Sequence, residues 1–261
     1  MFELMNIWVK GNDLADRAIK KRELNEFQRG ILVRYCSFYR RLAILDKRRF
    51  EHRVKRFMEE HNYVGREGVV ITQKMKLLIA STAVMLTFGM RRYLFSEFDN
   101  IIIYPKDYFS HVTKMQHKGE TNPKYRTIVF SWNDFLEGLK VEYDNLNLGL
   151  HELTHALHFT CLRRRNFTSR YFINKFGELL EILKNRSLQR RVVESGYIRP
   201  YGFRNKYEFL SVLVEHFFET PNEFKQKLPE LYKIASQMLN LDPAAFDKKP
   251  ALFKSIVLGS A

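Results

Sequence analysis

The chain has 261 residues, of which 45% are hydrophobic and 14% aromatic, and this excludes a disordered or low-complexity protein. A net charge of +15 would suit a nucleic-acid partner, but the basic residues form short, separate clusters near the ends of predicted helices, so we do not expect nucleic acid to be the main partner. The two cysteines, Cys36 and Cys161, lie far apart and exclude a disulfide scaffold.

The N-terminal residues 1–22 form a basic, weakly periodic segment that we expect to be loosely ordered. The chain does not open with the pattern of a secretory leader, and its two separate cysteines fit a reducing compartment, so a cytoplasmic protein is expected. No internal repeat or linker divides residues 23–261. We expect these residues to form a single domain.

The first part of this domain, residues 23–95, is predicted to be helical. Apolar residues keep helical spacing from Leu24 to Leu42, and Asp46 is expected to cap a second helix. Thr72 is expected to cap a third helix that carries the longest apolar run, residues 77–90. This run is shorter than the roughly 20 residues that span a bilayer, so it predicts a buried helix and no membrane span.

Two short segments rich in β-branched residues, 100–104 and 127–132, are predicted to be strands. The polar stretch between them contains His111, His117, Gly119 and Pro123 and is expected to be an irregular, functional loop. The strand at 127–132 either aligns a peptide substrate by strand addition or is an ordinary core strand. The pattern does not decide between these two interpretations.

Residues 147–162, NLGLHELTHALHFTCL, carry two histidines with helical spacing. On a helix, His151 and His155 share one face and can bind one metal ion, while Glu152 lies beside the ion where a bound water would sit. Most neighbouring residues are apolar, so this helix is expected to be buried, and buried polar groups need partners. The pattern is typical of the HExxH zinc site of metallopeptidases, and satisfied core histidines are the alternative.

Further helices are predicted at residues 170–183, 205–219 and 221–241. A catalytic zinc takes a third protein ligand, and Glu208, inside an apolar helix, is the best candidate. Glu215 lies about two turns further on nearly the same face and would orient a ligating histidine through a hydrogen bond. Glu219 and Glu223 are expected to face solvent.

Five segments in collinear order carry a family resemblance: NYVGREGVVIT, IIIYPKDYF, VFSWNDFLEG, NLGLHELTHALHF and EFLSVLVEHFFETPNEFKQKLPELYKIASQMLNLDP. The chain resembles the Mlc titration factor A family of zinc peptidases, whose catalytic core is similar to the metallopeptidase domain of anthrax lethal factor. This implies an α+β, mainly helical fold, in which a zincin-like core with a small β-sheet, residues 96–245, follows the helical part. It also implies one zinc ion per chain, held by His151, His155 and Glu208, with Glu152 as general base.

The resemblance implies roles for further residues. Tyr201 matches a tyrosine near the zinc that assists the developing oxyanion, and His111 matches a histidine that the family associates with the metal. A fourth ligand would mask the site until a loop moves. Asn147, which precedes the motif helix, is expected to support the site together with Glu215, whereas His158 departs from the family pattern because an aspartate often stands at its position.

We therefore expect a zinc metallopeptidase that is aminopeptidase-like on short peptides, as the resemblance implies. Zinc would polarise the scissile carbonyl and the bound water, and Glu152 would take the proton from that water and return it to the leaving amine. The alternative is a regulatory protein that binds and sequesters a transcriptional repressor, the property for which the family is named.

Overall fold

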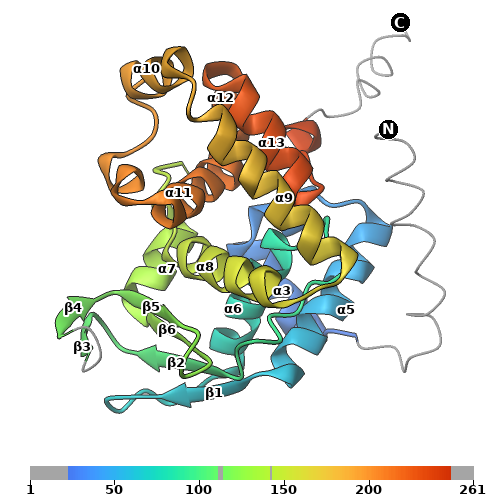
Figure 1. The fold of residues 1–261 in the computed structure, drawn as a ribbon. Helices are drawn as coiled ribbons and strands as arrows, with labels where there is room; N and C mark the ends of the chain where they lie inside the picture. Colours follow the sequence, from blue (N-terminus) through green and yellow to red (C-terminus); the bar gives the residue numbers. More distant parts are fainter. Residues whose placement is uncertain (1–22, 111–113, 142, 248–261) are drawn as a thin grey trace, which may run out of the picture.

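The computed structural model describes residues 23–110, 114–141 and 143–247. The basic segment 1–22 and His111 lie outside these residues. The described part is mainly helical with small sheets, so the predicted α+β class is confirmed. Figure 1 shows the sheets at one end of the molecule and the C-terminal helices at the other, with helix α8 (Leu148–Arg163) between them.

The described N-terminal part contains helices α3 (Glu26–Tyr35), α4 (Ser37–Arg41), α5 (Ile44–Glu60) and α6 (Gln73–Leu86). The helix expected to continue to Leu42 is interrupted at Cys36, whose backbone is extended (φ −127°, ψ 93°). The prediction that Asp46 caps the next helix is wrong, because Ala43 holds that position and Asp46 lies in the first turn. Thr72 caps α6 as predicted, since its hydroxyl accepts the N–H of Met75 at 3.2 Å.

The larger sheet has the strand order β1-β2-β6-β5. Strands β1 (Asn62–Gly65), β2 (Asn100–Tyr104) and β6 (Thr127–Ser131) are parallel, and β5 (Gly119–Asn122) pairs with β6 in the antiparallel direction. The two predicted strands are therefore confirmed, but β6 lies inside the sheet. The interpretation of residues 127–132 as the substrate-aligning strand is wrong, because both edges of β6 are occupied.

The stretch expected to be an irregular loop contains β5 and a separate two-stranded sheet, β3 (Tyr108–Ser110) with β4 (Met115–His117). All three strands are short, and β4 and β5 are mostly polar, so they lack the apolar alternation that reveals a strand in a sequence. Their hydrogen-bonded partners, rather than their own residue preferences, decide their conformation.

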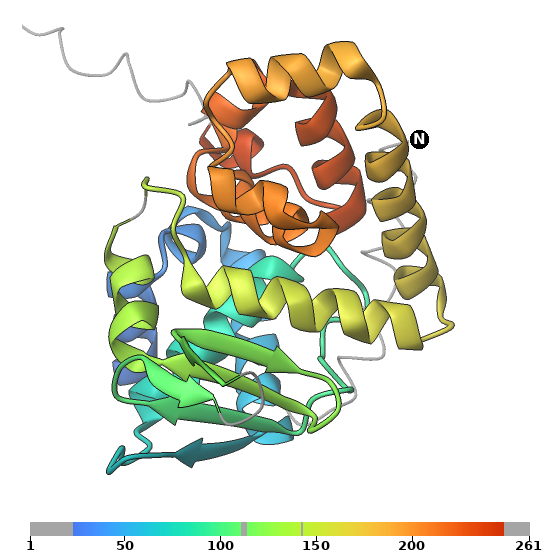
Figure 2. The ribbon, with the colours of Figure 1, turned by 60° about the vertical axis from the view of Figure 1, so that its left-hand side comes forward.

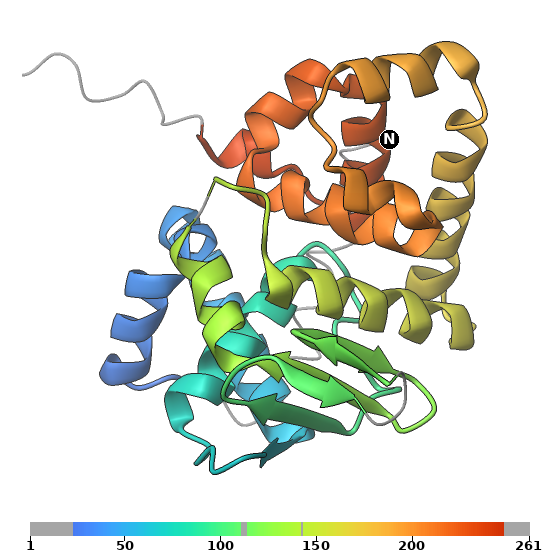
Figure 3. The same ribbon diagram turned by 90° about the vertical axis from the view of Figure 1, so that its left-hand side faces the viewer.

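Helix α7 (Trp132–Lys140) follows β6, and α8 then crosses the sheet on the side of β5 and β6. Figures 2 and 3 show α8 between the larger sheet and the C-terminal helices. Those helices are α9 (Phe167–Ile182), α10 (Arg186–Glu194), α11 (Lys206–Glu219), α12 (Pro221–Lys227) and α13 (Pro229–Leu239), with 3-10 turns η1 (Pro200–Arg204) and η2 (Pro243–Asp247). The single helix expected over residues 221–241 is divided at Pro229, which starts α13.

A single buried apolar cluster runs from Leu24 to Ala244 and joins the N-terminal helices to the C-terminal ones. It includes the apolar side chains predicted to be buried on the second helix, namely Phe50, Val54, Phe57 and Met58. Helices α6 and α8 are buried on almost all sides. Among the described residues, no helix combines the length and the apolar character that crossing a membrane requires.

Candidate metal centre

Helices α8 and α11 bring three potential metal ligands together. His151 Nε2 lies 2.9 Å and His155 Nε2 3.5 Å from Glu208 Oε2, and the two histidine nitrogens are 3.3 Å apart. Ligand atoms of all three residues lie within 4.8 Å of one another. Glu208 stands in the first turn of α11, where the side chain of Asn205 accepts its backbone N–H at 3.1 Å and so sets the start of the helix.

The donor set fits a zinc ion. Two imidazole nitrogens and one carboxylate oxygen are ligands that zinc accepts, and a catalytic site needs only three from the protein. In the part of the chain that the structure describes, His151, His155 and Glu208 are the only such group of histidine, cysteine, aspartate or glutamate side chains. They are buried or half-buried, which favours a bound cation over a solvated surface cluster.

A second carboxylate, which is itself paired with an arginine, fixes the Nδ1 side of the His151 ring. His151 Nδ1 donates to Glu215 Oε1 at 2.7 Å, and Arg199 Nη2 donates to the same oxygen at 2.7 Å. Glu215 Oε2 accepts the backbone N–H of Asn147 at 3.0 Å. Because Nδ1 is engaged in this way, Nε2 of His151 is directed towards Glu208 and the metal position.

The charges around His151 show why a cation fits. Burial lowers the pKa of His151, but hydrogen bonds to Glu208 and Glu215 outweigh this effect and raise the pKa to about 10. Burial also opposes ionisation of Glu208, yet its hydrogen bonds with His151 and His155 lower its pKa well below the usual range. The carboxylates therefore hold a positive charge at this position, which a proton or a metal ion can supply.

Glu152 lies on α8 beside the three ligands and is buried. The hydroxyl of Thr121 on β5 lies 2.9 Å from Glu152 Oε2 and 2.9 Å from the Glu152 carbonyl oxygen. A Cβ atom at Gly119 would lie 2.7 Å from Glu152 Cγ, so only glycine allows this close approach. Sequence reasoning missed Thr121 and Arg199, and nothing in their local sequence marks either residue.

Tyr201 lies in η1, and its ring centroid is 5.7 Å from that of His151. Its side chain is partly accessible, at 38% exposure. Burial, followed by the nearby Glu208 carboxylate, raises the pKa of the tyrosine hydroxyl, which therefore stays protonated at neutral pH. The guanidinium of Arg204 lies 4.4 Å from the centre of the same ring.

His158 lies in a packed aromatic environment. Its ring is 5.1 Å from those of Phe176 and Tyr207, and burial, followed by the charge of His155, lowers its pKa to about 4. The side chain is therefore neutral at pH 7. An imidazole carries no negative charge, so His158 does not replace the carboxylate of the aspartate that the family often has at this position.

The expectation that Glu219 faces solvent is wrong, whereas Glu223 is exposed as expected. Asn147 donates its side-chain N–H to Glu219 Oε1 at 3.0 Å, and Glu219 Oε2 is buried with no hydrogen-bond partner among the described residues. Burial raises the pKa of this carboxyl to about 8. Asn147 also caps α8, because its side-chain oxygen accepts the N–H of Leu150 at 2.9 Å.

The comparison with known protein families agrees with this site. Residues 11–239 match the family described as glucose-regulated metallo-peptidase M90, and the chain belongs to this metallopeptidase family, as the resemblance to the titration factor implied. An uncharacterized protein from Synechocystis sp. is 24% identical over 253 residues, which are 88% of this chain and 90% of that protein. The family description concerns a peptidase and does not favour the alternative of a repressor-binding protein.

Proposed function

We propose that this chain is a zinc-dependent peptidase that cleaves short peptides in an aminopeptidase-like manner and has a zincin-like catalytic core. The observation that carries the proposal is the convergence of His151, His155 and Glu208 on one point, with Glu152 next to it. Family membership supports a metal and a peptide substrate. The preference for a free N-terminus rests on the family resemblance alone.

His151, His155 and Glu208 would hold the zinc ion, leaving a position for water. When bound, zinc supplies a Lewis acid that polarises the scissile carbonyl and lowers the pKa of water. Glu215 and Arg199 keep the ring of His151 in the orientation that presents Nε2. The protein therefore fixes the ligands before substrate arrives, so that little reorganisation is needed.

Glu152 would act as general base. Thr121 engages its Oε2, so Oε1 is the oxygen that would take a proton from water and later return it to the leaving amine. Tyr201 would donate its hydroxyl proton in a hydrogen bond to the oxyanion that forms at the carbonyl, because its raised pKa keeps it protonated.

The substrate would bind along β5, which is one of the two edge strands of the larger sheet in the described residues. β5 passes close to Glu152 through Gly119 and Thr121, so a peptide paired with its outer edge would run past the proposed zinc. Pairing of backbone groups would align the peptide irrespective of its side chains.

The test combines metal analysis with peptide hydrolysis on protein purified without added metal. The wild type should contain about one zinc per chain. Glu152→Gln should keep this zinc and lose at least about a hundredfold in kcat, whereas His155→Ala should lose zinc and activity together. Glu178→Gln, an exposed change on α9, is the matched control and should change neither quantity.

Peptides with a free N-terminus and peptides with an acetylated N-terminus test whether the cleavage is aminopeptidase-like. Preferential cleavage of the free form supports the aminopeptidase-like assignment. Equal cleavage of both forms would contradict that assignment but leave the peptidase intact. Full activity of Glu152→Gln would contradict the proposed mechanism.

A further inference from the structure

The turn η1 and the start of α11 carry a run of exposed side chains next to the candidate metal centre. Residues 201–207, the rim segment, lead directly to the candidate ligand Glu208, and all of them except Gly202 are exposed. The rim segment contains three aromatic residues and two basic ones, namely Tyr201, Phe203, Tyr207, Arg204 and Lys206. A peptide bound at the metal position would lie beside this surface.

Arg204 lies over the aromatic ring that is next to the metal ligands. Its guanidinium carbon is 4.4 Å from the centroid of the Tyr201 ring, and this centroid is 5.7 Å from that of the His151 ring. A cation–π contact holds the side chain but does not use its N–H groups as hydrogen-bond donors. The ammonium nitrogen of Lys206 is similarly placed, 5.1 Å from the centroid of the Tyr207 ring. Aromatic rings thus position both cations of the rim segment.

Neither cation of the rim segment forms an ion pair with a carboxylate among the described residues. Arg199 differs from them, although its guanidinium carbon is only 5.7 Å from the centroid of the same Tyr201 ring, because it donates to Glu215 Oε1 at 2.7 Å. Arg204 therefore keeps the planar fork of donors with which a guanidinium binds a carboxylate through two parallel hydrogen bonds.

The two carboxylates that face His151 do not neutralise this charge. Glu208 Oε2 lies 2.9 Å from His151 Nε2 and 3.5 Å from His155 Nε2, where a bound ion would compensate it. Glu215 is compensated by Arg199 and by the hydrogen bond from His151. A negatively charged group of a substrate would therefore meet uncompensated positive charge at the rim segment.

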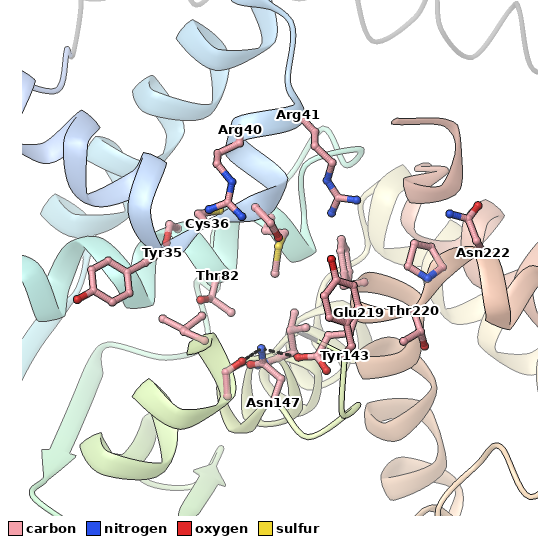
Figure 4. Close-up of a pocket in the computed structure, with 18 of the residues that line it drawn as sticks. Tyr35, Cys36, Arg40, Arg41, Thr82, Tyr143, Asn147, Glu219, Thr220 and Asn222 are labelled. Carbon is pink, nitrogen blue, oxygen red and sulfur yellow. Dashed lines mark hydrogen bonds between the residues drawn. The ribbon is translucent and has the colours of Figure 1, made fainter. Parts of the chain in front are cut away.

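The cavity shown in Figure 4 is separate from this surface. Its volume is about 530 Å³, and Asn147 and Glu219 form part of its wall. Among the described residues that line it, none is a candidate metal ligand and none belongs to the rim segment. A peptide whose scissile bond lies at Glu152 would therefore extend along the rim segment rather than into this cavity.

We propose that Arg204, supported by the charge of Lys206, binds a carboxylate of the peptide substrate on the leaving-group side of the scissile bond. An aminopeptidase-like enzyme accepts little chain before this bond, so the carboxylate must follow it. Each residue of an extended peptide spans about 3.3–3.6 Å, so a carboxylate about one to three residues beyond the scissile bond would reach the guanidinium beside Tyr201.

The inference rests on the proposed peptidase function and names its substrate class. The substrates would be short peptides that end in a carboxylate, or carry an acidic side chain, close to the cleaved bond. Both groups offer the same planar pair of oxygens to a guanidinium. The two sources of the carboxylate are distinguished by the choice of peptide.

Binding is measured by calorimetry on the full-length Glu152→Gln variant loaded with zinc, which should hold peptides without cleaving them. The probes are trialanine, trialanine amide and the amide of Ala-Asp-Ala. At least one of the two peptides that carry a carboxylate should bind at least about tenfold more tightly than trialanine amide. Tighter binding of trialanine assigns the C-terminus, and tighter binding of the aspartyl peptide assigns the side chain.

Substitutions of Arg204 in the same Glu152→Gln background locate the carboxylate. Arg204→Gln should bring the affinities of the acid and the amide to within about threefold of each other. Arg204→Lys keeps the charge but lacks the planar fork, so it should retain only part of the preference. Arg190→Gln, which changes an exposed arginine of α10, is the matched control and should retain the full preference. Because Arg204 is exposed, its variants should keep the Tm of their parent.

Equal affinity for all three peptides, or no measurable binding of any of them at about 10 mM, would overturn the proposal. A carboxylate preference that survives Arg204→Gln would overturn it as well, because the carboxylate would then bind the zinc or another cation. Hydrolysis by the wild type is a separate readout. Its absence would contradict the proposed function, whereas the binding comparison in the Glu152→Gln background judges Arg204 without any turnover.

Discussion

At the scale of single residues, two glutamates on one face of α11 have different electrostatic roles. Glu215 is buried between His151 and Arg199, both of which donate hydrogen bonds to it. Glu219 is also largely buried but has an amide, from Asn147, as its hydrogen-bond partner and negative charges nearby. The charge of the first residue is therefore compensated, while the second is driven towards its neutral form.

Replacing Arg199 should weaken the metal site without touching a ligand. Arg199→Gln removes the cation that compensates Glu215, so the orientation of His151 becomes less fixed and zinc affinity should fall about tenfold or more. Competition with a fluorescent chelator measures this change. Arg191→Gln, which loses only a surface pair with Glu230, is the control and should leave zinc affinity unchanged.

Glu219 should make the stability of the protein pH-dependent. Its pKa in the folded chain is about 8, above the ordinary value of 4.5, so between these values the folded state binds a proton that the unfolded state has released. Stability from this group is therefore present at low pH and is lost as pH rises towards 8. Glu219→Gln cannot ionise and should raise Tm relative to the wild type by several degrees at pH 9 but little at pH 5.

Glu223→Gln is the control for this experiment, because Glu223 is exposed and paired with Lys227 on the surface. Its effect on Tm should not grow between pH 5 and pH 9. A constant difference between Glu219→Gln and the wild type over the same range would show that Glu219 is ionised in the folded protein.

At the scale of elements, the approach of β5 to α8 shapes the proposed active site. Gly119 and Thr121 lie on the strand, and Glu152 and Leu148 face them from the helix. The strand is short and polar, yet it contacts Glu152, the proposed general base, and forms a sheet edge at which a substrate could pair. An element with a weak sequence signal thus supports the proposed chemistry.

Gly119→Ala should disturb this contact. The added Cβ would lie 2.7 Å from Glu152 Cγ and 2.9 Å from Leu148 Cδ1, so Glu152 must move, and we expect kcat to fall about tenfold or more while zinc stays bound. Gly177→Ala is the matched control on α9, where a Cβ meets no atom within 4 Å. This control should keep its activity and gain stability of about 0.5–1 kcal/mol. Normal kcat in Gly119→Ala would mean that Glu152 tolerates the displacement.

At the scale of the whole molecule, the three candidate ligands connect two helices that lie far apart in the chain. His151 and His155 belong to α8, which contacts the sheet, and Glu208 belongs to α11 in the C-terminal helical part. A bound ion would therefore crosslink the two parts of the fold and bind the native state far better than the unfolded chain.

Removal of the metal should accordingly lower thermal stability. Treatment of the wild type with a chelator should reduce Tm by several degrees, because the native state loses a ligand and retains three carboxylates around His151. The same treatment should leave Tm of Glu208→Ala unchanged, since this variant is expected to have lost the ion already. An equal effect of chelator on both proteins would place the metal elsewhere.

The sequence alone determined the local features of this protein. The apolar spacing around Asn147–Leu162 predicted the buried motif helix, Thr72 predicted the start of α6, and the β-branched runs predicted β2 and β6. The apolar helix around them singled out Glu208 and Glu215, and the collinear resemblance identified the family. Such features depend on residues close together in the chain, where side-chain spacing and capping act directly.

The tertiary structure alone decided which residues surround the motif. Arg199, Thr121 and Gly119 contact Glu215 or Glu152 because distant strands and turns pack against α8, and the same packing buries Glu219, which was expected in solvent. It also put β5, rather than residues 127–132, at the edge of the sheet. Burial and the charge of neighbours depend on contacts between segments far apart in sequence, and a local pattern does not contain them.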